Sequence, residues 1–123
     1  MSALEKHIKQ EILKAGPMRV EKLMELAGAH YYGSRDPFGV GGDFTTAPEI
    51  SQMFGEMIGV WVADTWIKMG SPAQLVLLEC GPGRGTLMAD LLRGTRHVPG
   101  LHDALNIHLL EGSPVLKEAQ SRA

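Results

Sequence analysis

The chain has 123 residues, of which 44% are hydrophobic and 21% are charged, and its formal net charge is −2. This composition is that of a globular domain, and the length allows one core but is short for a complete Rossmann-type enzyme. The basic residues are scattered, which disfavours a nucleic-acid substrate. No apolar run reaches the length of a membrane span and the N-terminus lacks the apolar core of a signal peptide, so we expect no membrane insertion.

The single cysteine, Cys80, excludes an internal disulfide and fits a reducing compartment. We therefore expect a cytoplasmic protein of bacterial origin, although a mitochondrial matrix protein without its transit peptide would have the same features. We expect Cys80 to be a buried, inert thiol. The histidines show no zinc-type spacing with one another or with Cys80, so we expect no metal site.

Apolar residues at helical spacing predict two short helices at the N-terminus. The first covers residues 4–15 and stops at Gly16, and the second covers residues 20–28. Residues 30–44 are rich in glycine and aromatic side chains and show no period. This pattern predicts a long loop, and such loops in compact domains are usually functional or disordered.

The clearest helix is predicted to follow this loop. Thr46 and Glu49 have the spacing of a capping box, with a proline in the first turn. Apolar residues then recur at i, i+3 and i+4 spacing as far as Trp61 and Thr65, and Gly70 ends the pattern. We expect the stripe of methionine and tryptophan side chains to pack in the core against a sheet.

The second half of the chain has the order strand, glycine loop, helix, strand, acid, helix. Residues 74–80 are a continuous apolar run typical of a strand buried on both faces, and residues 105–110 form a second strand. Thr86 opens the helix between the strands, and Ser113 with Pro114 opens the helix after them. This order is that of a βαβ unit with parallel strands.

These elements predict an α/β fold of the Rossmann-like class, of which the chain holds the first βαβ unit. We expect a helical region with a cofactor-covering loop at residues 1–72 and the start of a nucleotide-cofactor domain at residues 73–123. Two parallel strands do not make a stable sheet with helices on both faces. We therefore expect the chain to be part of a longer one.

Three glycines, Gly81, Gly83 and Gly85, directly follow the first strand. Glycines allow a sharp turn into the helix and let a ligand lie against the backbone. Dinucleotide-binding loops favour G-x-G-x-x-G, but Thr86 stands where that pattern has its last glycine. The tighter loop suits a ligand without a pyrophosphate, such as S-adenosylmethionine.

Two acids flank this loop in the predicted fold. Glu111 ends the second strand, where Rossmann-like folds place a carboxylate that accepts hydrogen bonds from ribose hydroxyls; an exposed acid at a strand end is the alternative. Glu79 comes just before the loop and either orients the loop through backbone N–H groups or meets a cofactor ammonium through water. Arg84, within the loop, either faces a cofactor carboxylate or is solvated.

Three runs of this chain resemble the MidA family of class I methyltransferases: YYGSRDPFGVGGDF at 31–44, GDFTTAPEISQMFGE at 42–56 and LLECGPGRGTLMADLLR at 77–93. The resemblance covers residues 4–118. It implies a class I methyltransferase fold with extra N-terminal helices, and S-adenosyl-L-methionine as the cofactor. The family's mitochondrial members methylate an arginine of a respiratory complex I subunit, so the resemblance implies a protein substrate as partner.

The resemblance also implies roles for individual residues. It assigns the cofactor loop to Gly81, Gly83 and Gly85 and the ribose acid to Glu111, and it places residues 43–52 over the cofactor. The full set of expected cofactor-binding residues is Glu79, Gly81, Gly83, Gly85, Glu111, Asp43, Thr45 and Thr46. For Asp43, an Asx-turn is the alternative.

For arginine methylation, a nearby carboxylate would orient the guanidinium. Glu56 is the candidate for that catalytic role, with a solvated helix position as the alternative. It ranks above Glu49, which the capping box already explains.

Two other functions are compatible with the same sequence. An NAD(P)-dependent oxidoreductase would use the same βαβ unit, although the residue at Thr86 counts against it. A non-catalytic scaffold or fragment would use the extra helices to bind a partner.

Overall fold

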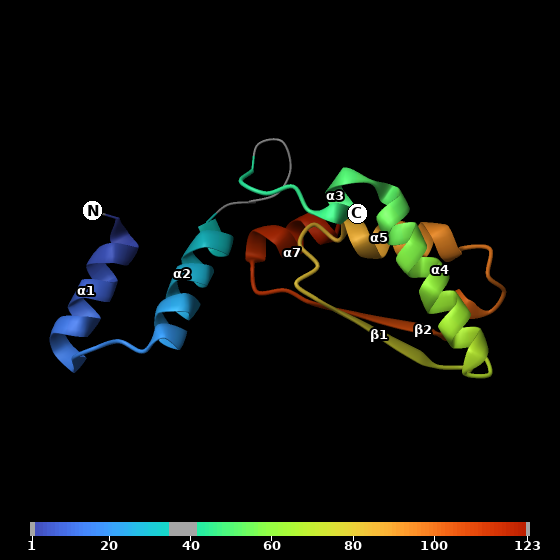
Figure 1. Ribbon diagram of the computed structural model, residues 1–123, viewed down its shortest axis with the longest axis horizontal. Helices are drawn as coiled ribbons and strands as arrows, with labels where there is room; N and C mark the ends of the chain where they lie inside the picture. The colour runs from blue at the N-terminus through green and yellow to red at the C-terminus, as the bar shows by residue number, and fades with distance from the viewer. Residues whose placement is uncertain (1, 35–41, 123) are drawn as a thin grey trace.

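The computed structural model of the chain describes residues 2–34 and 42–122. Seven helices and two strands are described within those ranges, and Figure 1 shows them in order along the chain. They are α1 (Ala3–Ala15), α2 (Val20–Ser34), α3 (Ala47–Ile50), α4 (Gln52–Lys68), β1 (Leu75–Cys80), α5 (Thr86–Thr95), α6 (Leu101–Ala104), β2 (Leu105–Leu110) and α7 (Pro114–Gln120). The short helix α6 directly precedes β2, where no helix was predicted from the sequence.

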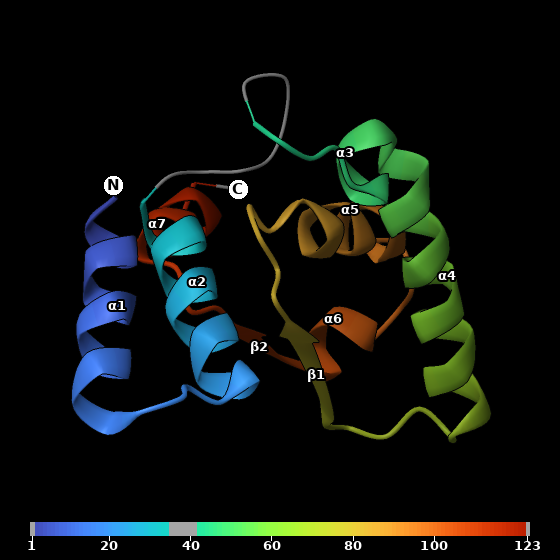
Figure 2. The same cartoon turned by 60° about the vertical axis from the view of Figure 1, so that its left-hand side comes forward.

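The N-terminal helices form a pair at one end of the molecule, and α4 and α5 lie at the other (Figures 1 and 2). Helix α1 has its predicted extent, and Gly16 ends it with a left-handed φ of 85°. Helix α2 continues past Gly28 to Ser34, so the predicted end of this helix and the predicted start of the loop are wrong. A glycine inside a helix costs only about 1 kcal/mol relative to alanine, which flanking helix formers offset. Residues 35–41 of the predicted loop lie outside the described residues.

The single long helix predicted after residue 46 is two helices, because the backbone of Ser51 is extended (φ −153°, ψ 127°). The hydroxyl of Ser51 accepts a hydrogen bond from the backbone N–H of Met53 at 3.2 Å and so caps α4. The predicted capping box is wrong, since Thr46 makes no side-chain cap bond. The carboxylate of Glu49 instead bonds residues at the start of α5.

Helix α4 packs against α5 through the face that carries its small residues. Gly55, Gly59 and Ala63 are buried there, and a Cβ added at Gly59 would lie 2.8 Å from the carbonyl oxygen of Leu91. The prediction that the stripe of methionine and tryptophan side chains packs in the core is wrong, because Trp61 is 65% exposed. Met53 and Met57 are exposed to similar extents. The close approach of the two helix backbones requires small side chains, so the larger apolar face of α4 turns outward.

The two strands are parallel and in register from Leu75 opposite Leu105 to Cys80 opposite Leu110, as the βαβ pattern predicted. Helices α4, α5 and α6 cover one face of this sheet. Buried residues of these helices, with partly buried strand residues, form two apolar clusters: Ala63, Trp66, Leu101 and Ala104 with Leu75 and Leu105, and Val62, Met88 and Leu91 with Leu77 and Ile107.

The opposite face of the sheet is open. Val76 and Leu78 are mostly exposed, and Cys80 is exposed as well. The expectations of a strand covered on both faces and of a buried thiol are therefore wrong for this chain. Among the helices of residues 2–34 and 42–122, none combines the length and apolar character needed to cross a membrane.

Candidate functional site

The glycine loop lies at the carboxyl ends of both strands, where parallel sheets bind ligands. Gly81, Gly83 and Gly85 have φ values of 71°, 57° and 84°, which residues with a side chain rarely adopt. The N–H of Gly81 donates to the carbonyl of Leu110 at 2.9 Å, and the N–H of Gly85 donates to the carbonyl of Pro82 at 2.8 Å. The backbone of the loop is thus held in a tight turn beside the end of β2.

A hollow of about 460 Å³, which we call the α2 hollow, opens on one side of this loop. Its size is within the range of small-molecule sites. It lies between α2 and the segment that follows β2. Its lining residues are Gly28, Ala29, Tyr32, Gly33, Gly81, Gly83, Glu111, Gly112, Ser113 and Leu116.

Glu111 gives this hollow its negative charge. Its Oε1 atom accepts a hydrogen bond of 2.8 Å from the backbone N–H of Ser113, which fixes the direction of the carboxylate. Ser113 also caps α7, because its hydroxyl accepts from the N–H of Leu116 at 3.3 Å. A carboxylate held at the end of β2 can accept hydrogen bonds from a pair of hydroxyl groups on a sugar.

A smaller hollow of about 190 Å³, which we call the Glu79 hollow, lies on the other side of the loop. Gly81 and Gly83 line both hollows, so the loop is the wall that they share. Burial raises the pKa of Glu79 above its ordinary value of 4.5. A carboxylate in such a position gains from a cationic ligand, which would restore its ionised form.

Helix α3 closes the Glu79 hollow through Glu49. The hydroxyl of Thr86 donates to Oε1 of Glu49 at 2.5 Å, and Nη1 of Arg84 donates to Oε2 at 3.4 Å. The Glu49 side chain is only 17% exposed. These contacts place a carboxylate beside the first turn of α5 and tie α3 to the glycine loop.

The structure thus brings together most, but not all, of the residues predicted from the sequence. Gly81, Gly83, Glu111, Glu79 and Thr46 line one or both hollows. Gly85 lines neither; it precedes α5, and a Cβ added there would lie 3.4 Å from the side chain of Gln120. Thr45 lines neither, and the carboxylate of Asp43 accepts a hydrogen bond from the hydroxyl of Tyr31.

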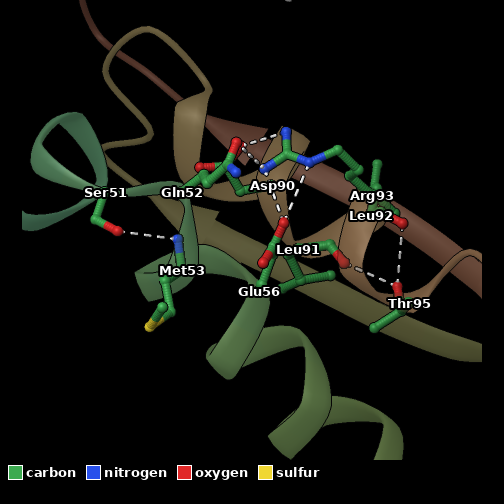
Figure 3. A network of polar contacts seen from close by, with 9 residues as sticks. All are labelled: Ser51, Gln52, Met53, Glu56, Asp90, Leu91, Leu92, Arg93 and Thr95. Atoms are coloured by element: carbon green, nitrogen blue, oxygen red, sulfur yellow. Dashed lines mark hydrogen bonds and ion pairs between the residues drawn. The ribbon is translucent and has the colours of Figure 1, made fainter.

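Glu56 lies in a different environment, at the interface between α4 and α5. Figure 3 shows the guanidinium of Arg93 among the side chains of Gln52, Glu56 and Asp90. The Arg93 atoms Nη2 and Nη1 lie 3.2 Å from Glu56 Oε1 and 2.7 Å from Asp90 Oδ1. These contacts raise the pKa of Arg93, through its hydrogen bonds first to Asp90 and then to Glu56. Glu56 lines neither hollow, and its role in catalysis stays a prediction that this geometry does not favour.

Several residues of the site were not predicted from the sequence. The outer wall of the α2 hollow comes from Gly28, Ala29, Tyr32 and Gly33, about fifty residues before the glycine loop. The two glycines are the signal that could have found this wall, because they interrupt an otherwise helical pattern. Gly28 was instead predicted to end the helix.

Comparison with known proteins points to one family. Residues 57–123, more than half of the chain, match the family described as "Putative S-adenosyl-L-methionine-dependent methyltransferase". The chain is 44% identical to the mitochondrial protein arginine methyltransferase NDUFAF7 homolog of Drosophila melanogaster, over 98% of this chain and 28% of that protein. It is 42% identical to the NDUFAF7 protein of Danio rerio and 38% identical to that of Homo sapiens, over 94% of this chain in both cases and 29% and 28% of those proteins.

The chain therefore spans under a third of the length of these relatives, but the matched part includes both hollows and the helices around them. The resemblance to a methyltransferase family is confirmed. This chain belongs to the family of S-adenosyl-L-methionine-dependent methyltransferases.

Proposed function

We propose that the protein transfers a methyl group from S-adenosyl-L-methionine to an arginine side chain of a protein substrate, within a Rossmann-like class I methyltransferase fold. The observation that carries this proposal is the pair of hollows that share the glycine loop. One hollow holds Glu111 and the other holds Glu79. A ligand with a ribose at one end and an ammonium at the other matches these two acids.

The donor set of the site fits this cofactor. Glu111 would hold the ribose hydroxyls, because its carboxylate is oriented by the N–H of Ser113. Glu79 would face the ammonium, which favours its ionised form and so offsets the cost of its burial. Gly81 would let the ligand lie against the loop, because nothing lies within 4 Å of the position that a Cβ would take.

A dinucleotide cofactor fits the same site poorly. Its pyrophosphate would need the first turn of the helix after the loop, where free N–H groups attract anions. In this structure Glu49 already lies there, bonded to the hydroxyl of Thr86 at 2.5 Å. A carboxylate at that point repels a pyrophosphate, which disfavours the alternative of an NAD(P)-dependent oxidoreductase.

When bound, S-adenosyl-L-methionine supplies an electrophilic methyl group on a sulfonium. The residues of this chain would hold the two ends of the cofactor, keep water out and leave the methyl group accessible to the acceptor. Asp43, Thr45, Thr46 and Gly85 stay in the proposal as residues near the cofactor or supporting its loop. We assign no catalytic base within this chain.

The arginine acceptor in this proposal comes from the relatives, whose names are those of mitochondrial protein arginine methyltransferases. The resemblance to the MidA family adds a role in respiratory complex I assembly to this proposal. The same names favour a mitochondrial location. The matrix as the compartment, and the alternative of a bacterial cytoplasm, stay predictions from the sequence.

Calorimetric titration of the purified protein with S-adenosylmethionine, its demethylated product S-adenosylhomocysteine, and NADH tests the cofactor. We expect binding of the first two and none of NADH. Glu111→Gln should weaken binding of both sulfur ligands by about 1.5–3 kcal/mol, the usual range for hydrogen bonds to a charged group. Tight binding of NADH, or unchanged affinity in the Glu111 variant, would contradict the proposal.

Methyl transfer itself is tested with a labelled methyl donor and protein extract from mitochondria. We expect labelled methylarginine after hydrolysis of the product. A protein that binds the cofactor yet labels no arginine would instead be a scaffold or a methyltransferase for another acceptor.

A further inference from the structure

The outer wall of the α2 hollow comes from a helix that lies far from the glycine loop in the sequence. Gly28, Ala29, Tyr32 and Gly33 lie on one side of α2, because Gly28 and Tyr32 are four positions apart along the helix, as are Ala29 and Gly33. They lie across the hollow from Gly81 and Glu111, the residues of the proposed cofactor site. Helix α2 thus faces the end of the site that holds the sugar.

The glycines on this face have no neighbour in the protein that requires them. A Cβ added at Gly28 or at Gly33 would meet nothing within 4 Å, and neither residue has a left-handed φ. Alanine would therefore be tolerated by the protein and would favour the helix. Glycine at these positions keeps the hollow wide, and Tyr32 lines the same wall.

One hydrogen bond ties this wall to the ribose acid. The hydroxyl of Ser113 donates to the backbone carbonyl of Tyr32 at 2.5 Å, and the N–H of Ser113 donates to Glu111 at 2.8 Å. Ser113 is only 2% exposed. It therefore connects two walls of the hollow, one from α2 and one from the segment after β2.

We propose that α2 is the wall against which the adenine ring of the cofactor lies, and that Ser113 is the positioning residue that holds this wall at the ribose acid. This inference rests on the proposed function, and it assigns the N-terminal helices a part in cofactor binding. An adenine ring is flat and apolar on its faces, so it suits a wall of small residues with one aromatic residue among them.

The wall is tested by filling the hollow from α2. Gly28→Ala and Gly28→Leu should both leave the thermal midpoint equal to or above that of the wild type. Affinity for S-adenosylhomocysteine should fall at least tenfold in the leucine variant and less in the alanine variant, and affinity for adenosine should fall by the same factors. His30→Leu is the matched control, because His30 is an exposed residue of the same helix that does not line the hollow.

The outcomes separate this inference from the proposed function. If the wild type bound no adenosine-containing ligand, the proposed function itself would fail. If Gly28→Leu folded and bound S-adenosylhomocysteine like the wild type, α2 would not be the adenine wall. A loss of affinity for S-adenosylhomocysteine without a loss for adenosine would overturn the assignment as well, because it would place the methionine end at α2.

Ser113 is tested by Ser113→Ala, which keeps the N–H that orients Glu111 but removes the bond to Tyr32. We expect faster hydrogen exchange across the last turns of α2 and an affinity for adenosine at least fivefold lower, with both restored by Ser113→Thr. Because Ser113 also caps α7, Ser51→Ala serves as a control that removes a helix cap away from the hollow. Faster exchange in α2 with wild-type affinity would show that the bond is structural only.

Discussion

Helices α2 and α4 both carry glycines, but for opposite physical reasons. In α4, a Cβ added at Gly55 would lie 2.5 Å from the Cβ of Asp90, and one added at Gly59 would lie 2.8 Å from a backbone oxygen of α5. In α2, a Cβ added at Gly28 or Gly33 would meet no atom within 4 Å. Glycine in α4 therefore serves contact with protein, whereas glycine in α2 leaves space that protein does not fill.

The polar contacts of the two helices differ in the same way. Arg93 on α5 joins Glu56 of α4 to the nearly buried Asp90, which locks α4 and α5 together (Figure 3). Near its C-terminal end, helix α2 is bonded from the carbonyl of Tyr32 to the hydroxyl of Ser113 and from the hydroxyl of Tyr31 to Asp43. The contacts of the α4–α5 pair thus join two helices to each other, whereas those of α2 join a helix to the segments beside the α2 hollow.

The largest effect should come from Gly59→Ala. The added methyl group must push α4 away from the backbone of α5, and overpacking of this kind costs about 1–3 kcal/mol of the free energy of unfolding. Urea denaturation measures this loss, and the same substitution at Gly28 is the control, with an expected gain of about 0.5–1 kcal/mol. Equal effects at the two positions would break the comparison between the helices.

A pH-dependent effect of intermediate size should come from Glu79, which lines the Glu79 hollow beside the glycine loop. Because burial raises its pKa in the folded protein, the stability linked to this group is present below about pH 4.5 and is lost as the pH rises through the raised pKa. Glu79→Gln should remove this decline, which urea denaturation at several pH values would measure.

The same group sets the expected pH dependence of cofactor binding. An ammonium requires the ionised carboxylate, so wild-type affinity for S-adenosylhomocysteine should rise with pH through the pKa of Glu79 and stay flat in the Glu79→Gln variant. Calorimetry between pH 4.5 and pH 7 measures this affinity in both proteins. If the affinity rose with pH equally in both proteins, another group would bind the ammonium. The Glu79 hollow would then not be part of the cofactor site.

The strands and the glycine loop were predicted well because their signals are local. Residues 105–110 are the strand found, and Thr86 is the first residue of α5, since apolar runs and glycine turns act over a few residues. The orientation of α4 could not be predicted in this way. Both of its faces are apolar or small, and the choice between Trp61 and Gly59 depends on how closely α5 approaches.

The same distinction between local sequence signals and long-range packing applies to the candidate site. Glu111 and the loop glycines follow from one βαβ unit, so sequence spacing suffices to place them together. The wall from α2 depends on how a distant helix packs, and the hydrogen bond between Ser113 and Tyr32 joins residues 81 positions apart. No periodicity within α2 carries that information. The division of the chain at residue 72 stays a prediction, and residues from both sides of that division, on α2 and after β2, line the α2 hollow.

The smallest effect should come from Glu56→Gln, which tests whether the α4–α5 pair only supports the site. Glu56 and Arg93 are 36% and 41% exposed, and partly exposed ion pairs contribute about 0–1 kcal/mol. The neutral amide keeps the shape of the side chain and one acceptor for Arg93, whereas Asp90 still pairs with the guanidinium. We therefore expect a loss of stability below about 1 kcal/mol, with unchanged cofactor affinity and unchanged kcat for methyl transfer.

Glu49→Gln is the matched comparison, because Glu49 lines the Glu79 hollow. This substitution removes the negative charge beside Arg84 and Thr86, and it should lower the affinity for S-adenosylhomocysteine. A large fall in kcat for Glu56→Gln, at wild-type stability, would return Glu56 to the role of the carboxylate that orients the acceptor guanidinium. It would also show that α4 reaches the acceptor rather than bracing α5.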